Sequence, residues 1–209
     1  MSAARIHLIR HGEVDNPHHV VYADLPGYGL SATGYRQAGD TAEHLASAPI
    51  SAVISSPLLR ARQTAEAIAA AHGLELEIDD RLTEWAGGVR WAGVGWSDLD
   101  EVFPGELTAY LEDPLNITFG PESLQECGQR TAAAARDWES RVASGEVVVV
   151  SHQDTIHAGR LELTGAWRPD YHADKPEHAS VVTLVPREGD WDEVEYWAPA
   201  QGEPFPPVD

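Results

Sequence analysis

The stretch Val147-Val148-Val149-Val150-Ser151-His152-Gln153-Asp154 decides the fold, because four β-branched residues are followed directly by polar ones. A continuous apolar run of this kind is typical of a strand buried on both faces, which occurs in parallel sheets covered by helices. Helical patterns flank it, over about residues 122–144 before it and 154–164 after it. The stretch therefore predicts a central strand of an α/β sheet.

Outward from this strand, the chain alternates short apolar runs with helical patterns. Further strands are predicted at residues 6–9, 52–55, 74–78, 181–185 and 193–197, and further helices at residues 31–47 and 58–72. Ser31 suits the N-cap of the first of these helices, and Gly73 suits the end of the second. We therefore expect one domain over residues 1–209, folded as a three-layer α/β/α sandwich with a mostly parallel central sheet.

Residues 85–121 break this alternation, with several glycines and the aromatic side chains of Trp85, Trp91, Trp96 and Phe103. We expect this segment to leave the sheet as a helical or loop excursion that acts as a lid over a site. A satellite aromatic cluster packed beneath a long loop is an equally weighted alternative.

The composition limits the classes of partner. The chain has 14 basic and 34 acidic residues, for a formal net charge of -20 at pH 7. Nucleic acids and anionic membrane surfaces both require basic patches, so we expect neither as a partner. No signal-peptide pattern and no run of roughly 20 apolar residues is recognisable. With Cys127 as its single cysteine, the chain is expected to be a reduced cytoplasmic protein with no internal disulfide.

Polar residues follow several of the predicted strands at the point where each strand ends. Arg10-His11-Gly12-Glu13 follows the first strand, and Ser151-His152 follows the central one. Arg60 lies near the start of the helix after the second strand, and Glu84 follows the third. Because ligands of open α/β sheets bind beyond the carboxyl ends of the strands, we expect these side chains to converge there.

Such a group of side chains suits phosphoryl transfer. A neutral imidazole attacks phosphorus and holds the phosphoryl group covalently. Arginines bind phosphate through paired hydrogen bonds and stabilise its equatorial oxygens. A carboxylic acid protonates the departing oxygen and then deprotonates the attacking water. The residues predict a reaction without metal or cofactor, in a local positive pocket formed by Arg10, Arg60 and a protonatable His152.

At these residues the chain resembles the histidine phosphatase superfamily, which contains cofactor-dependent phosphoglycerate mutases and many phosphatases. The resemblance is carried, in the family's order, by Leu8-Ile9-Arg10-His11-Gly12-Glu13, Leu30-Ser31-Ala32-Thr33-Gly34-Tyr35-Arg36-Gln37-Ala38, Ser55-Ser56-Pro57-Leu58-Leu59-Arg60-Ala61-Arg62-Gln63-Thr64-Ala65, Leu82-Thr83-Glu84 and Val150-Ser151-His152. It implies that His11 is the nucleophile and that Arg10 and Arg60 clamp the phosphate. It also implies that His152 donates to the phosphoryl oxygens and that Glu84 gives and takes the proton.

The chain departs from the family pattern at two positions. Gln153 stands where the family usually has glycine after the second histidine; its backbone N–H can still face the phosphate while its side chain narrows the pocket. Asn16 comes one residue before the position where the family often has asparagine, which is Pro17 here. Asn16 and Tyr22, the latter in a loop that resembles one in a subset of bacterial members, are weaker candidates for contacting the substrate.

The favoured function is hydrolysis of a small phosphorylated metabolite, a phosphomonoester, through phosphohistidine. Mutase-type phosphoryl transfer is an alternative, although the mutases tend to be longer. Gln153 motivates a second alternative, a non-catalytic phosphometabolite-binding protein on the same fold. A metal-dependent hydrolase using His172, Asp174 and His178 is the third, and polar loop residues are the simpler interpretation of that group. Glu84 has a structural alternative, as a carboxylate stabilised at a helix N-terminus.

Overall fold

The computed structural model describes residues 4–188 and 190–201 of the chain. The two ends of the predicted domain, residues 1–3 and 202–209, lie outside the described residues, as does residue 189. Within the described ranges, no helix combines the length and apolar character needed to cross a membrane.

A six-stranded sheet forms the middle layer, with the strand order β3-β2-β4-β1-β5-β6. The strands are β1 (Arg5–Arg10), β2 (Ile50–Ser55), β3 (Leu76–Ile78), β4 (Glu146–Ser151), β5 (Val181–Arg187) and β6 (Asp190–Trp197). Strands β1 to β4 run parallel to one another, β5 pairs antiparallel with β1, and β6 pairs antiparallel with β5. The predicted α/β fold with a mostly parallel sheet is confirmed, and the apolar run of β4 lies inside the sheet as expected.

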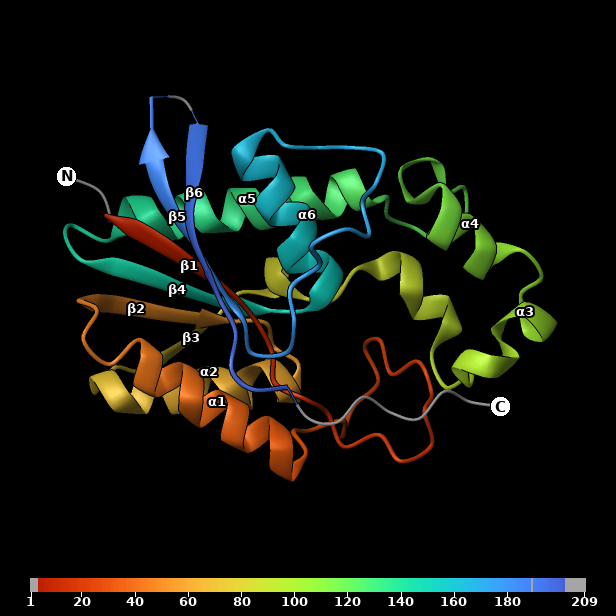
Figure 1. Cartoon of the computed structure of the whole chain (residues 1–209), viewed down its shortest axis with the longest axis horizontal. Helices are drawn as coiled ribbons and strands as arrows, with labels where there is room; N and C mark the ends of the chain where they lie inside the picture. Colours follow the sequence, from red (N-terminus) through yellow and green to blue (C-terminus); the bar gives the residue numbers. More distant parts are fainter. Residues whose placement is uncertain (1–3, 189, 202–209) are drawn as a thin grey trace.

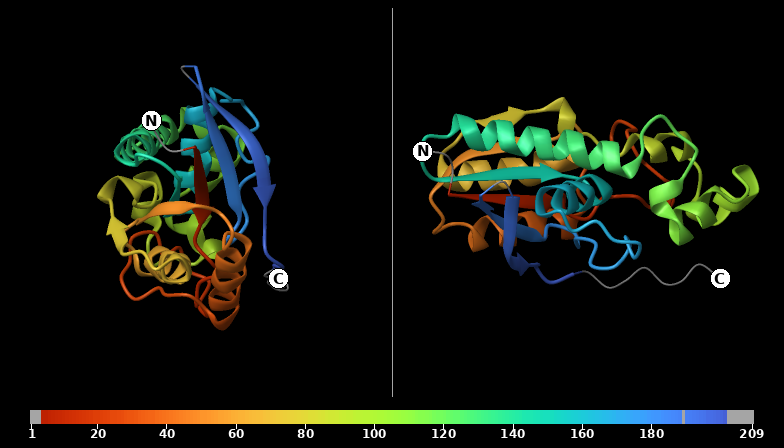
Figure 2. Two further views of the ribbon diagram at one scale, coloured as in Figure 1. Left: turned by 90° about the vertical axis from the view of Figure 1, so that its left-hand side faces the viewer. Right: turned by 90° about the horizontal axis from the view of Figure 1, so that it is seen from above.

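Helices cover both faces of this sheet (Figure 1). The four long helices are α1 (Ala32–His44), α2 (Leu59–His72), α5 (Leu124–Arg141) and α6 (Gln153–Thr164). Helices α1 and α2 lie on one face and α5 and α6 on the other, which makes three layers (Figures 1 and 2). The predicted α/β/α sandwich therefore describes the arrangement.

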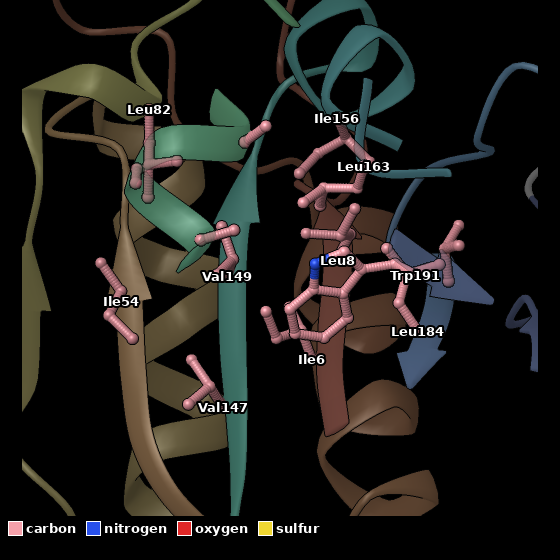
Figure 3. Close-up of a cluster of buried hydrophobic side chains, with 14 residues drawn as sticks. Ile6, Leu8, Ile54, Leu82, Val147, Val149, Ile156, Leu163, Leu184 and Trp191 are labelled. Carbon is pink, nitrogen blue, oxygen red and sulfur yellow. The ribbon is translucent and has the colours of Figure 1, made fainter. Parts of the chain in front are cut away.

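The buried strands divide their side chains between the two faces because successive residues of a strand point to opposite sides. Val147 and Val149 of β4 pack with Ile156 of α6 in one apolar cluster, part of which Figure 3 shows. Val148 and Val150 pack into a second cluster on the face covered by α1 and α2. All four valines are fully buried, which is why the run contains no polar residue.

Capping residues set the helix boundaries. The Ser31 side chain accepts a hydrogen bond from the Gly34 backbone N–H at the start of α1. Ser123 and Glu126 form a reciprocal capping box, so α5 begins at Leu124 rather than at the predicted residue 122. Gly73 ends α2 in the left-handed conformation, with φ of 64°, which glycine adopts without steric cost.

Between β3 and α5 the chain leaves the sheet, as expected for residues 85–121. This segment contains the short helices α3 (Leu99–Val102) and α4 (Glu106–Glu112), beyond one end of the sheet in Figures 1 and 2. Three 3-10 helices accompany them, at Ala86–Trp91, Trp96–Asp98 and Pro114–Asn116, and a fourth precedes the segment at Asp80–Leu82. Trp85, Trp91 and Tyr110 form a third buried cluster with Leu124 and Leu161. The segment is thus a packed aromatic cluster, and its action as a lid stays a prediction.

Candidate active site

The parallel register of β1 and β4 brings two histidines together. Arg10 pairs with Ser151 across the two strands, and the His11 backbone N–H donates to the Ser151 carbonyl at 2.9 Å. His11 and His152 therefore leave neighbouring strands at the same edge, with ring centroids 5.2 Å apart. Both side chains are buried, with exposed fractions of 1% and 0%.

A close approach of backbones explains the glycine that follows His11. A Cβ at Gly12 would lie 2.6 Å from the Gly34 carbonyl oxygen, at the start of α1. The Gly12 N–H donates to Thr64 Oγ1 of α2 at 3.0 Å. The turn after β1 thus sits against the first turn of α1 and the side of α2, and this holds His11 in place.

The hydrogen bonds of His11 define its chemical state. Its Nδ1 donates to the Gly12 carbonyl at 2.7 Å, so Nε2 carries the lone pair. Arg60 Nε donates to that Nε2 at 3.2 Å. Burial lowers the pKa of His11 well below its ordinary value, and the positive charge of Arg60 lowers it further. The result is a neutral imidazole whose unprotonated nitrogen, Nε2, is the one able to act as a nucleophile.

His152 is held by a hydroxyl group. Its Nε2 is hydrogen-bonded to Ser56 Oγ at 2.7 Å, and when that hydroxyl donates, the imidazole proton is on Nδ1. That Nδ1 is buried and has no hydrogen-bond partner among the described residues, with Glu84 Oε2 3.8 Å away. Burial lowers the pKa of His152 well below its ordinary value, followed by the charge of Arg60. A buried imidazole beside arginines favours the neutral form, so His152 contributes a donor rather than the positive charge that a protonatable His152 was expected to add.

The two arginines occupy different depths. Arg10 Nη1 donates to the Pro176 carbonyl at 3.0 Å and Nη2 donates to His178 Nε2 at 2.7 Å. Arg10 Nε is buried and has no hydrogen-bond partner in residues 4–188 and 190–201. Arg60 is fully buried, donates to the Ala23 carbonyl at 2.7 Å, and lies 4.7 Å from the centre of the Tyr22 ring. Both guanidinium groups are therefore fixed before any ligand is present.

Glu84 lies beside these groups. Its Oε1 accepts from the Trp85 backbone N–H at 2.9 Å, and its Oε2 is 4.0 Å from Arg60 Nη2. Burial raises the pKa of Glu84 above its ordinary value, and the carboxylate of Asp154 raises it further. A raised pKa lets this carboxyl group keep its proton to a higher pH than usual, as a general acid requires.

The site opens into a cavity of about 410 Å³. Arg10, His11 and Glu84 line it, whereas Arg60 and His152 lie beneath its surface. The three remaining candidates also line it: Gln153, expected to face the phosphate, and the weaker candidates Asn16 and Tyr22.

These three contribute in different ways. The polar atoms of Asn16 bond to the Val20 backbone, with Nδ2 to the carbonyl at 2.9 Å. The Tyr22 ring centroid is 6.5 Å from that of His11. Gln153 is the first residue of α6, where backbone N–H groups favour an anion.

Other candidates lie elsewhere. Arg62 is half-exposed and pairs with Glu66 on α2. Cys127 is buried, and burial raises the pKa of its thiol, which disfavours the reactive thiolate. In the described part of the chain, no group of three or more histidine, cysteine or acidic side chains could hold a metal ion.

The proposed metal ligands have separate partners. His172 Nε2 donates to the Tyr110 carbonyl at 2.6 Å, and Asp174 pairs with Arg168 at 2.7 Å. His178 accepts from Arg10, and burial followed by that arginine's charge lowers the pKa of His178 to about 3.

Sequence reasoning missed two supporting groups. The first is Ser56, which belongs to the Ser55–Ala65 motif. Its hydroxyl comes one residue after the end of β2, and this position could have indicated a contact with the residues that follow β4. The second group joins Asp154 to Lys175 at 2.7 Å, with the hydroxyls of Tyr110 and Tyr171 also donating to Asp154. The spacing of these residues in the chain does not indicate that group, because its members come from three separate segments.

The chain matches the model of the histidine phosphatase superfamily (branch 1) over residues 6–198. An uncharacterized protein of Mycobacterium tuberculosis is 40% identical over 183 residues, covering 87% of this chain and 89% of that protein. Phosphoserine phosphatase 1 of Hydrogenobacter thermophilus is 32% identical over 159 residues, covering 76% of this chain and 75% of that protein. The solved structure of mycobacterial glucosyl-3-phosphoglycerate phosphatase with VO3 is 27% identical, with a TM-score of 0.79, covering 94% of this chain and 100% of the other.

Proposed function

Because the chain belongs to branch 1 of the histidine phosphatase superfamily, we propose that it hydrolyses a small phosphomonoester through a phosphohistidine on His11. The observation that carries this proposal is the state of His11. Its Nδ1 is tied to the Gly12 carbonyl and its Nε2 lone pair faces the buried donor Arg60 Nε. A purely structural role for this histidine would not require a buried guanidinium group next to its unprotonated Nε2.

The surrounding donors suit a phosphoryl group. Arg10 Nε and His152 Nδ1 are buried polar atoms without a hydrogen-bond partner among the described residues. An unpaired buried donor costs free energy of about 1–3 kcal/mol, so its persistence favours a role in binding an anion. Phosphoryl oxygens would receive these donors together with Arg60, and the positive charges would stabilise the transferring group.

The first step transfers the phosphoryl group to the protein. His11 Nε2 attacks phosphorus, and the bond between phosphorus and the ester oxygen breaks. The Glu84 carboxyl gives its proton to that oxygen, which leaves as an alcohol. The raised pKa of Glu84 keeps the proton available for this step.

The second step returns the protein to its starting state. The Glu84 carboxylate takes a proton from water, whose oxygen attacks phosphorus. The bond between phosphorus and His11 Nε2 breaks, and inorganic phosphate leaves. His11 is again neutral and Glu84 is again protonated, so atoms and charges balance over the cycle.

The test is a screen for phosphate release over phosphomonoesters, with His11→Ala as the blank. Sugar phosphates, phosphoglycerates, nucleotides and phosphoamino acids form the panel, and the names of relatives add phosphoserine and glucosyl-3-phosphoglycerate. We expect release from at least one ester by the unmodified protein only. Interconversion of 2- and 3-phosphoglycerate without phosphate release would instead indicate a mutase, and binding with no turnover across the panel would indicate a non-catalytic protein.

A further inference from the structure

Five tryptophan and tyrosine rings of the described residues line the cavity in front of His11. Trp85, Trp91, Trp96 and Tyr110 come from the segment between β3 and α5, and Tyr22 faces them from the loop after β1. These rings lie beside Arg10 and Glu84, so a bound phosphomonoester would direct its leaving group toward them.

The two walls are joined by backbone hydrogen bonds. The Val21 N–H donates to the Val94 carbonyl at 2.8 Å, and the Gly93 N–H donates to the Val21 carbonyl at 2.8 Å. The Trp96 N–H donates to the His19 carbonyl at 3.2 Å. The walls therefore have a fixed separation, and the space between them has a defined shape.

The polar atoms of the buried rings are used within the wall. Trp85 Nε1 donates to the Glu122 carbonyl at 2.9 Å, and Trp91 Nε1 donates to Glu106 Oε2 at 2.8 Å. The Tyr110 hydroxyl donates to Asp154 at 2.9 Å. These rings thus present apolar surface rather than hydrogen-bond donors to the cavity.

Within the described ranges, the lining offers no second cation to an anionic leaving group. Glu13, Glu84 and Asp154 line the cavity, and Arg10 is the sole arginine or lysine among its lining residues in the described chain. Arg10 is committed to the phosphoryl group under the proposed function. Glu84 carries a proton in the proposed first step and Asp154 already pairs with Lys175. A carboxylate on the leaving group would therefore lose solvent beside Glu13 without gaining a cation, which is unfavourable.

We propose that this cavity selects phosphomonoesters whose leaving alcohol is uncharged and carries an apolar ring, and that it discriminates against leaving groups bearing a carboxylate. The inference rests on the proposed function and names the substrate class of that same site. Ring stacking and burial supply the attraction, and Glu13 together with the lack of a second cation in the described lining supplies the discrimination.

Two pairs of esters test the two parts. Comparing 4-carbamoylbenzyl phosphate with 4-carboxybenzyl phosphate changes the charge at nearly constant shape, and the methylene group insulates the leaving oxygen from it. We expect kcat/KM to favour the carbamoyl ester by at least about tenfold. Comparing benzyl phosphate with ethyl phosphate tests the ring, and we expect benzyl phosphate to be favoured by about tenfold or more.

Two variants tie these preferences to the cavity. Trp96 is 47% exposed at the cavity, so Trp96→Ala should fold and should reduce the benzyl preference about threefold or more. The matched control is Trp197→Ala, because Trp197 stacks on His44 outside the cavity and should leave the preference unchanged. Glu13→Gln should reduce the carbamoyl preference, whereas Glu66→Gln on α2 should not.

Equal or better hydrolysis of the carboxylated ester, or of ethyl phosphate, would overturn the inference and leave the proposed function standing. Equal effects of Trp96→Ala and Trp197→Ala, or of the two glutamate variants, would overturn it as well, because the preferences would then not arise in this cavity. Absence of hydrolysis of all four esters and of the whole panel would overturn the proposed function, and the inference with it.

Discussion

The edge of the sheet and the wall of the cavity touch one another but are built in different ways. At the edge, His11, His152 and Ser56 follow strands whose register is set by backbone hydrogen bonds. In the wall, Trp85, Trp91 and Tyr110 are placed by packing among short helices. The sheet therefore determines where the reacting atoms lie, whereas the segment outside the sheet determines what lies next to them.

This difference separates chemistry from selectivity. A strand end that moved would carry its neighbours with it, because parallel strands share one ladder. A side chain of the wall can change without altering the strands. We therefore expect changes at the edge to lower turnover for every ester, and changes in the wall to alter stability or the choice among esters.

The largest effect is expected at the edge, for His11→Ala. Removing the nucleophile should lower kcat by about 10⁴-fold or more for every ester that the protein hydrolyses. The fold should persist, because His11 lies beyond the end of β1, and β1 and its neighbours β4 and β5 keep their apolar contacts. Initial rates and far-UV circular dichroism measure the two quantities. A general loss below tenfold would place the reaction on another residue.

Glu84→Gln should have the next effect, lowering kcat by about 10²- to 10³-fold for esters with poor leaving groups. The first step needs protonated Glu84, so activity of the unmodified protein should fall as the pH rises through the raised pKa of Glu84. The variant should lose that dependence, which pH profiles of kcat would show. An unchanged profile in Glu84→Gln would assign the proton transfer to another group.

The sheet edge could be predicted from the sequence, whereas for the wall only the aromatic residues of 85–121 could be singled out and not their contacts. Four valines in a row reveal a buried strand, and the polar residues after it must then lie at its end. The neutral state of His152 was missed because burial depends on what surrounds a residue, not on its type. The bond from Arg10 to His178 was missed for a related reason, since their segments are 168 positions apart and meet only in the folded chain.

In the wall, Lys175→Met should affect stability more than reaction chemistry. The pKa of Asp154 lies below its ordinary value although burial opposes this, because Lys175 and two tyrosine hydroxyls stabilise the carboxylate. Removing the cation should lower the free energy of unfolding by about 3 kcal/mol at pH 7. The loss of stability should become smaller as the pH falls through the pKa of Asp154. A carboxyl group with a lowered pKa stabilises the folded state only while it is ionised, at pH values above that pKa.

Denaturant unfolding at several pH values measures this effect. The matched control is Arg187→Met, which breaks an exposed pair with Asp192 and should cost about 0.5 kcal/mol or less. Adding Asp154→Asn to Lys175→Met should recover part of the loss, because no buried charge then remains. Equal losses for the two single variants would mean that the pair in the wall contributes no more than a surface pair.

The smallest of these effects is expected for Ser56→Ala at the edge. Without the Ser56 hydroxyl on Nε2, the proton of His152 is no longer directed to Nδ1, and kcat should fall about tenfold with little change in KM. Ser55→Ala is the control, since its hydroxyl donates to the Ser56 carbonyl rather than to His152. Similar losses in both variants would indicate a general disturbance of the strand end.

The central claim is that His11 becomes phosphorylated during turnover. Rapid mixing with a hydrolysable ester, an alkaline quench that preserves phosphohistidine, and peptide mass spectrometry test it directly. The account predicts one phosphoryl group on His11 that appears before phosphate release and disappears as the ester is consumed. Steady turnover with no phosphoryl group on His11, or with the group on another residue, would contradict the account.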